Sequence, residues 1–468
     1  MIEWSILTER HFTACASLAA LGVQLKHLDL FGPIRETVLI AQKTIKHAPS
    51  DKLYDAFISL LAGAGGLVEI NQRLRADPAL QRAFGREACA EQSVVQGMLN
   101  ACTAENVKQM EQAMDMIYRQ HSQGYRHDYR ASLQLLDVDM SGMPCGKKAA
   151  FATKGFFVNQ RNRRGRQLGR VLASCYDEVV VDQLFGGTIQ LTRALRPLMQ
   201  AAETTLHLDR AKRRRTLVRI DAGGGSLDDV NWLLRRGYQI HGKDYSSART
   251  RRLAQSVERW VEDQEVEGRQ IGWVTQPATE YVRPVRRIAV RCRKHDGQWA
   301  VGVLISTLTD AQMLGLTGQE AKPRHDPVAV LQASVSLYDQ RGGGVETSFK
   351  GDKQGLGIGK RSKKRFEAQQ MVMLLGCLAH NVVVWSRAFL AASPLQHYGT
   401  LRMVRDVFHV SGFLVMDTPG QKIVQIVLNQ AAPLAPPLVG SLHRLLAPAQ
   451  VAIQLGTMEL WSANRRRP

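Results

Sequence analysis

The sequence has few cysteines, and they lack the paired spacing of zinc and redox sites. The seven cysteines are odd in number and far apart, so we expect reduced thiols with structural roles. An unbroken apolar run of about twenty residues, the length that a bilayer requires, is also missing. The nearest approach, residues 371–392, contains His380, Asn381 and Arg387, which favours a buried helix over a membrane span.

Acidic residues are in the minority. Against 62 Lys and Arg stand 42 Asp and Glu, which leaves a formal net charge of +20 and points to nucleic acid or an anionic membrane as partner. Apolar residues make up 44% of the 468 positions, enough to form a core for about three domains of ~150 residues each. Charged residues at Glu3, Glu9 and Arg10 interrupt the region where a secretion signal needs an apolar run. We therefore expect a cytoplasmic, nucleoid-associated protein with no membrane partner.

Residues 1–125 have the pattern of helices. Between Thr103 and Gly124, apolar residues recur at three- and four-residue steps, and Thr103 is suited to cap that helix. The region is predicted to be an all-helical domain. DNA binding and dimerisation are equally compatible with it.

The pattern changes to strands at residue 133. The apolar run 133–139 ends in two acids, Asp137 and Asp139, and the run 217–221 ends in Asp221 before a glycine turn. Strands are also predicted at 167–174, 178–183 and 238–240. A helix is predicted between Ser226, as its N-cap, and Gly237, which makes the second acid part of a β-α-β unit.

Residues 242–325 read as a β-rich insertion. Arg287, Arg291 and Arg293 alternate with apolar residues on one strand of a predicted hairpin, which gives that hairpin a basic face. On the returning strand, Trp299 is expected in the core rather than stacked on an extruded base. A helical stretch interrupted by glycines follows at 334–392, and one more hairpin is predicted at 409–428.

A third acid stands in this helical stretch. Glu346 and Lys353 are seven positions apart, so on a helix they fall within about 20° of one face and can contact one ligand. Tyr338 lies about 80° from Glu346 on the same count. Arg341 would lie about 140° away unless Gly342 to Gly344 distort the helix.

These residues resemble the insertion-sequence DDE transposases that carry a Tyr-Arg-Glu-Lys signature around the last catalytic acid. In that family two, three and six residues separate the four signature positions. Here Tyr338, Arg341, Glu346 and Lys353 are separated by two, four and six, so one residue is extra. The strand-terminal Asp221 resembles the family's second acid. Asp139, followed by Met140 and Ser141, resembles the first, with Asp137 as the alternative.

The resemblance implies a ribonuclease-H-like catalytic core in which Asp139, Asp221 and Glu346 are the catalytic residues and bind two Mg²⁺ ions, with Mn²⁺ as a substitute. Carboxylates suit this role because hard divalent cations prefer oxygen ligands and, as a pair, stabilise both oxygens of a phosphoryl displacement. In the family, the Tyr, Arg and Lys positions contact DNA, which here are Tyr338, Arg341 and Lys353. A basic run that starts at Lys360 and Arg361 is predicted to continue the DNA track.

The sequence thus predicts an α/β fold: a ribonuclease-H-like core with a β-rich insertion, preceded by an all-helical N-terminal domain. The predicted division is 1–125 (helical region), 126–241 (first part of the core), 242–325 (insertion), 326–400 (second part of the core) and 401–468 (C-terminal region). The expected function is that of a bacterial insertion-sequence transposase that binds terminal inverted repeats in double-stranded DNA and catalyses metal-dependent cleavage and strand transfer, as a homodimer when two ends are paired. Two alternatives stay open: a catalytically inactive DNA-binding protein derived from a transposase, and a ribonuclease-H-fold nuclease without strand transfer.

Overall fold

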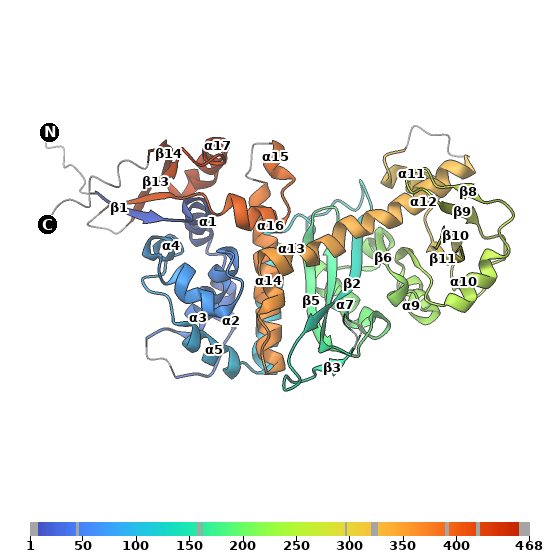
Figure 1. Ribbon diagram of the computed structural model, residues 1–468, viewed down its shortest axis with the longest axis horizontal. Coiled ribbons are helices and arrows are strands. Elements are labelled where there is room, and N and C mark those ends of the chain that lie inside the picture. The colour runs from blue at the N-terminus through green and yellow to red at the C-terminus, as the bar shows by residue number, and fades with distance from the viewer. Residues whose placement is uncertain are drawn as a thin grey trace. The chain divides into compact units, whose positions relative to one another are not determined.

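The protein is described from a computed structural model, which covers residues 8–43, 46–155, 157, 160, 162–294, 297–319, 326–388, 393–417 and 422–457. The chain forms two compact units (Figure 1). The first contains the described residues of Met1–Ser122, Lys148–Ala150 and Lys350–Pro468, and the second contains those of Gln123–Lys147 and Phe151–Phe349. Each unit is described by itself below.

The second unit is built on one large mixed sheet. Its ten strands are β2 (Gln134–Pro144), β3 (Thr153–Lys154), β4 (Arg164–Ala173), β5 (Glu178–Gly186), β6 (Thr216–Ile220), β7 (Gln239–Lys243), β8 (Val261–Glu262), β9 (Arg269–Trp273), β10 (Arg286–Arg293) and β11 (Trp299–Ser306). They follow the order β3-β4-β2-β6-β7-β11-β10-β9-β8, and β5 also pairs with β4. The strands predicted from apolar runs at 133–139, 167–174, 178–183 and 217–221 are confirmed as β2, β4, β5 and β6.

The centre of this sheet combines antiparallel and parallel strands. β2 pairs with β4, and β4 with β5, in antiparallel orientation, whereas β2-β6 and β6-β7 are parallel. Helices make the crossovers that parallel neighbours need: α7 (Leu191–Leu206) and α8 (Arg210–Arg214) lead into β6, and α9 (Leu227–Arg236) leads into β7. As predicted, Ser226 caps α9, because its side chain accepts from the Asp229 N–H, and Gly237 ends the helix in the left-handed conformation.

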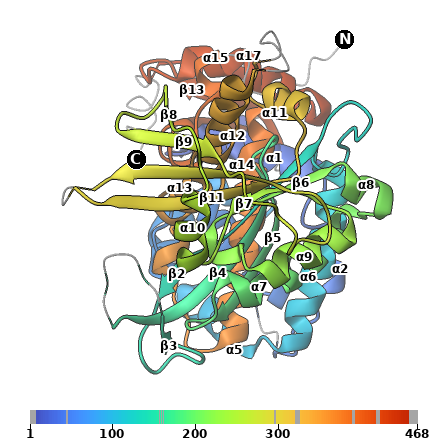
Figure 2. The same ribbon diagram turned by 90° about the vertical axis from the view of Figure 1, so that its right-hand side faces the viewer.

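The predicted insertion extends the central sheet. β10 and β11 form the expected antiparallel hairpin, with Ile288 opposite Leu304, and Leu304 in turn pairs with Lys243 of β7 (Figure 2). The helices of this part are α10 (Ser247–Ala254) and α11 (Asp310–Leu316). The sheet is therefore continuous from the core strands into the insertion.

A long helical stretch crosses the sheet. It comprises α12 (Pro327–Arg341), one π-helical turn, η4 (Gly342–Glu346), and α13 (Thr347–Gly355). α12 packs through Ala329, Ala333 and Leu337 against buried leucines that include Leu135 of β2 and Leu217 of β6. This packing places the end of α12 beside the strands that carry the acids.

The first unit combines helices with a small sheet. The helices are α1 (Ala16–His27), α2 (Gly32–Thr37), α3 (Pro49–Leu61), η1 (Leu67–Glu69), η2 (Ile70–Leu74), α4 (Pro78–Ala83), α5 (Gln92–Ala101), α6 (Ala104–His121), η5 (Ile358–Lys360), α14 (Phe366–Arg387), α15 (Ser393–Gln396), α16 (Thr400–Arg402), η6 (Met403–Val407), α17 (Ala435–Leu446) and η7 (Ala447–Ala449). The strands, in sheet order, are β1 (Thr8–Thr13), β12 (Gly412–Asp417), β13 (Ile423–Asn429) and β14 (Ala452–Gly456). The predicted helix after Thr103 is α6, with a capping box between Thr103 and Asn106.

The expectation of an all-helical N-terminal domain is wrong in one element. β1 is a strand, and it pairs antiparallel with β12, about 400 positions further along the chain. Its pairing partner is so distant that local periodicity gives no sign of it. The predicted C-terminal hairpin is confirmed as β12-β13, but its predicted turn lies largely outside the described residues. Because β1 and β12 share a sheet, the N-terminal and C-terminal regions form one unit.

One helix within the described residues is long and apolar enough to cross a membrane. This is α14, and 89% of its most apolar window is buried inside the protein. It contains His380, whose Nδ1 lies 2.7 Å from Asp352 Oδ1 in the interior of the first unit. α14 thus has the surroundings of a core helix, as its polar residues predicted.

Candidate functional site

Two acids lie side by side where the parallel pairing of β2 with β6 ends, Asp139 within β2 and Asp221 directly after β6. The register of β2 and β6 places Val138 opposite Ile220, so the residues that follow, Asp139 and Asp221, are neighbours across the sheet. Asp139 is largely buried, and the charge of Asp221 acts on it. Two acids that are far apart in the sequence are therefore adjacent in the fold.

Arg341 connects the first acid with the third. Its Nη2 lies 3.0 Å from Asp139 Oδ2, and its Nη1 lies 3.3 Å from Glu346 Oε1. Nη2 also donates to the carbonyl of Val138 at 3.3 Å. The guanidinium is almost fully buried, Asp139 is 15% exposed and Glu346 is 60% exposed. One arginine thus links α12, β2 and the π-helical turn.

The π-helical turn explains how Arg341 and Glu346 meet despite the extra residue between them. In a π-turn, residues i and i+5 stack as i and i+4 do in an α-helix. The side chain of Thr347 donates to the carbonyl of Gly342, five positions earlier, at 3.1 Å. Gly344 in this turn has a packing reason, because a Cβ atom there would lie 2.9 Å from an oxygen of Asp137. The expected glycine distortion is real, and it brings Glu346 onto the side of the helix that carries Arg341.

Asp139 is held in a charge environment that favours its protonated form. Burial raises its pKa to about 6, the positive charge of Arg341 lowers it, and the negative charges of Asp221 and Glu346 raise it. Burial would lower the pKa of Arg341, but Asp139 and Asp221 outweigh that effect and raise it. The arginine is therefore a permanent cation beside a group of three acids.

Asp137, the alternative first acid, is occupied in a buried ion pair. Its two oxygens accept from Nε and Nη2 of Arg219 at 2.6 and 2.8 Å, and Ser174 donates to it at 2.5 Å. Both side chains of the ion pair are almost fully buried. Arg219 also donates to the Leu337 carbonyl of α12 at 2.9 Å. Asp137 therefore orients Arg219, which holds the end of α12 against the sheet, and Asp139 is the acid that contacts Arg341.

Tyr338 lies close to the same charges. Burial raises the pKa of its hydroxyl to about 12, the charge of Arg341 lowers it, and Asp221 and Glu346 raise it further. The ring packs edge-on against His241 at 6.3 Å between centroids. Tyr338 and Arg341, three positions apart on α12, thus both lie near the acids.

The carboxylates form an incomplete metal-binding set as they stand. Asp221 Oδ1 is a buried oxygen with no hydrogen-bond partner among the described residues. Within the same part of the chain, no three His, Cys, Asp or Glu side chains are grouped closely enough to hold a metal ion. The ion pairs of Arg341 with Asp139 and Glu346 explain this, because a cation bound to both acids has to displace the guanidinium from at least one of them.

A cleft of about 690 Å³ opens beside the two aspartates. Asp139, Asp221 and Gly223 form part of its lining, together with the start of α7 at Gln190 and Leu191. Polar residues from β3, β4 and two turns also line it, namely Lys154, Asn162, Gln167 and Thr188. No motif in the sequence marks these four residues as part of a site, and none marks Arg219.

The other predicted DNA-binding residues belong to the first unit. Lys353 is half-buried and Lys360 is exposed on η5. Arg361 is only 3% exposed, and its Nη2 donates to the carbonyl of Ala64 at 2.6 Å. Burial lowers its pKa to about 10. The expectation that Arg361 lies on a surface DNA track is therefore wrong, because its guanidinium satisfies an interior carbonyl instead.

The basic face of the insertion also differs from the prediction. Arg287 is buried and binds Glu280 at 2.8 Å, together with two backbone carbonyls. Trp299 is 40% exposed, so its expected place in the core is wrong. The Arg291 guanidinium lies 4.5 Å from the Trp299 ring centre and 4.0 Å from that of Trp260. An arginine between two tryptophans keeps an aromatic side chain at the surface through cation–π contact.

Comparison with known proteins places the chain in no family. No protein-family model and no curated protein matches it. Among solved structures, its fold is similar to that of a piggyBac transposase in a synaptic complex with hairpin DNA. That alignment has 12% sequence identity and a TM-score of 0.43, and covers 86% of this chain and 82% of that chain.

Proposed function

We propose that the protein is a DNA transposase that cleaves and joins phosphodiester bonds with divalent metal ions. The observation that carries the proposal is the meeting of Asp139, within β2, and Asp221, directly after β6, with Glu346 brought to Asp139 through Arg341. Acids at these three chain positions, in this order, are those that the signature marks.

The strand order supports a ribonuclease-H-like core. In the order β5-β4-β2-β6-β7, three antiparallel strands connected in sequence are followed by two parallel strands reached through helices. This is the arrangement expected of that fold, with the catalytic acids on the first and fourth strands. The carboxyl ends of parallel strands are also where α/β proteins commonly place their sites.

The donor chemistry fits a hard divalent cation. Asp139, Asp221 and Glu346 would hold Mg²⁺ or Mn²⁺, and the unpartnered buried Oδ1 of Asp221 supplies an oxygen ready to coordinate. The bound metal would stabilise the charge of the attacking and leaving oxygens. A cation near Asp139 favours its ionised form, which counters the burial that now favours the proton.

The chain's own residues position the DNA strand. Arg341 provides a planar cation, which is suited to grip a phosphate once it is released from an acid. The Tyr338 hydroxyl keeps its proton near neutral pH, so it can donate to a phosphate oxygen. The net charge of +20 favours binding to the DNA backbone, and that binding should weaken steeply with salt.

The test compares cleavage, strand transfer and binding on the same DNA. The substrate carries the inverted repeats that flank the gene, and the full chain is assayed with Mg²⁺, with Mn²⁺ and with chelator. We expect Asp139→Asn, Asp221→Asn and Glu346→Gln each to lower cleavage by at least about 100-fold while DNA affinity is retained. The control Asp228→Asn changes an acid that is 77% exposed in the same unit, and it should cleave normally.

A non-catalytic DNA-binding protein is the second candidate. The observation in its favour is that Arg341 already neutralises two of the acids, and that no three-acid metal cluster is formed within the described residues. The same experiment separates the two functions. DNA binding that is unaffected by all three substitutions, without cleavage in either metal, would support the second candidate, and cleavage without joined products would indicate a nuclease.

A further inference from the structure

A basic cavity lies in the first unit, at the start of α3. It measures about 480 Å³, within the range of about 300–1,000 Å³ that small-molecule sites occupy. Its charged and titratable lining consists of Lys43, Lys46, His47, Lys52, Arg75, Cys89 and Glu91. Four permanent cations therefore face one acid, which makes the cavity attractive to an anion.

Lys52 is the least exposed of these cations, at 4%. Its Nζ donates to the side-chain oxygen of Gln42 at 2.9 Å. No carboxylate in the described part of the chain lies within ion-pair distance of it. Burying an ammonium group that has only a neutral partner costs free energy of folding. An anion bound beside Lys52 would offset that cost.

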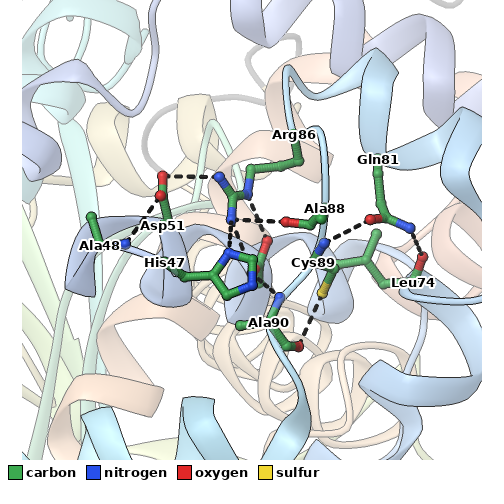
Figure 3. A network of polar contacts seen from close by, with 10 residues as sticks. His47, Ala48, Asp51, Leu74, Gln81, Arg86, Ala88, Cys89 and Ala90 are labelled. Carbon is green, nitrogen blue, oxygen red and sulfur yellow. Dashed lines mark hydrogen bonds and ion pairs between the residues drawn. The ribbon is translucent and has the colours of Figure 1, made fainter. Parts of the chain in front are cut away.

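The acids nearest to Lys52 along α3 are already neutralised by Arg86. Asp55 is completely buried and accepts from Arg86 Nε at 2.8 Å and from the Ala90 N–H at 2.8 Å. Asp51 lies 3.0 Å from Arg86 Nη1 and accepts from the Ala48 N–H at 3.2 Å. Figure 3 shows Arg86 between Asp51 and the loop that contains Ala88 and Cys89. Both acids of α3 are therefore paired with Arg86 rather than with Lys52.

His47 contributes a hydrogen-bond donor to the cavity lining. Arg86 Nη2 approaches its Nδ1 at 3.4 Å, and because arginine only donates, Nδ1 is the acceptor (Figure 3). The proton of the neutral ring is then on Nε2. Burial lowers the pKa of His47, the charge of Asp55 raises it, and Arg86 lowers it further, with a net decrease that favours the neutral ring.

The lining excludes a metal ion as the ligand. Burial raises the pKa of the Cys89 thiol, and Asp55 raises it further, so a thiolate is disfavoured at this wall. Four cations also repel a metal. What the lining offers is ammonium, guanidinium and imidazole donors, which together match the oxygens of a phosphate.

We propose that this cavity binds a phosphate group, with Lys52 as the buried counter-charge. The phosphate can be carried by a free phosphorylated compound or by the DNA backbone, and the chemistry that the cavity recognises is the same. The proposal goes beyond the function proposed above and uses none of its residues. It therefore stands or falls independently of the carboxylates on β2 and β6.

The test measures thermal unfolding of the full chain with increasing pyrophosphate, against sodium chloride at matched ionic strength. We expect the midpoint of the wild-type protein to rise by about 3 to 6 °C when pyrophosphate exceeds its dissociation constant tenfold. Lys52→Met should lose this response and, without ligand, should unfold at a higher temperature than the wild type, because a buried charge is removed. Lys108→Met changes an exposed lysine of α6 and should respond like the wild type.

A second, milder variant keeps the test informative if Lys52→Met does not fold. Lys46 is exposed, so Lys46→Gln should keep the fold and weaken pyrophosphate binding. The proposal is wrong if pyrophosphate stabilises the wild type no more than chloride does, or if Lys52→Met and Lys46→Gln both respond like the wild type.

A DNA-binding experiment with the same variants identifies the source of the phosphate. If pyrophosphate displaces a short labelled duplex and Lys52→Met lowers its affinity, the cavity binds the DNA backbone. If Lys52→Met binds the duplex normally but has lost the pyrophosphate response, the ligand is a free phosphorylated compound. Both results support the phosphate site.

Discussion

Two aspartates on one strand are predicted to respond to the same substitution in opposite directions. Asp139 and Asp137 are both on β2, two positions apart, and both are largely or fully buried. Asp139 lies 3.0 Å from Arg341, but its burial and the charges of Asp221 and Glu346 outweigh that cation and raise its pKa. Asp137 is paired with Arg219 through both of its oxygens. Changing each to Asn removes a charge that is unfavourable on balance in the first case and compensated in the second.

The change in the free energy of unfolding expected for Asp139→Asn follows from the pKa of Asp139, which burial raises from 3.8 to about 6. A difference of about 2 units corresponds to about 3 kcal/mol at 1.36 kcal/mol per unit, as an upper bound. Because the folded protein binds this proton more tightly, the stability that the group confers is complete below pH 3.8 and is lost as the pH rises through about 6. Asp139→Asn, which resembles the protonated acid, should therefore be more stable than the wild type by about 1–3 kcal/mol at pH 8 and equal to it near pH 4.

The matched substitution breaks a buried ion pair. Asp137→Asn leaves the guanidinium of Arg219 without its carboxylate in the interior. Such a loss typically costs about 3–5 kcal/mol. It should also loosen α12, because Arg219 connects Asp137 with the carbonyl of Leu337.

Urea unfolding of both variants and the wild type at pH 4 and pH 8 measures these differences, followed by tryptophan fluorescence. The second unit contributes Trp232, Trp260, Trp273 and Trp299 to the signal. The reasoning is refuted if Asp139→Asn is less stable than the wild type at pH 8, or if its stability difference is the same at both pH values. Similar effects of the two variants would also refute it.

Further predictions concern the π-helical turn, Arg341 and the aromatic contact. Deleting Gly343 alone should leave the unfolding midpoint nearly unchanged, because it converts the π-turn into an α-turn. Deleting two glycines rotates Glu346 by about 100° and should abolish cleavage. Equal cleavage activity of the two deletion variants would contradict this. Arg341→Met should unfold at a lower urea concentration than the wild type at pH 8, because the acids lose their cation. Mn²⁺ should stabilise this variant more than it stabilises the wild type. An Mn²⁺ effect no larger than in the wild type would count against competition between arginine and metal. Trp299→Ala should cost about 0.5–1 kcal/mol in urea unfolding, since it removes one cation–π contact with Arg291, and a loss above about 3 kcal/mol would mean that the ring has a core role.

The strands that carry the acids could be predicted because their signal is local. The runs ending in Asp139 and Asp221 are short, apolar and followed by turn residues, and such runs become buried strands in almost any context. The helix after Ser226 was equally clear from its cap, its acidic first turn and its final glycine. These local signals were enough to place each acid after an apolar strand, whereas the meeting of the acids was implied only by the family resemblance.

What could not be predicted depends on tertiary partners. β1 is a strand because β12 pairs with it, and Arg361 is buried because the carbonyl of Ala64 accepts its hydrogen bond. Arg219 pairs with Asp137, so Asp139 is the acid beside the other two. No sequence pattern shows that Arg219 lies opposite Asp137 in the sheet. The relation of Arg341 to Glu346 likewise required the π-helical turn to be seen.

The most direct measurement for the central claim is a crystal structure of the protein grown with Mn²⁺, with anomalous scattering recorded at the manganese edge. The account predicts anomalous peaks bounded by oxygens of Asp139, Asp221 and Glu346, with Arg341 moved away from at least one acid, and no such peaks in Asp221→Asn. A well-ordered site in which Arg341 still bridges Asp139 and Glu346 at saturating Mn²⁺, without an anomalous peak, would contradict it.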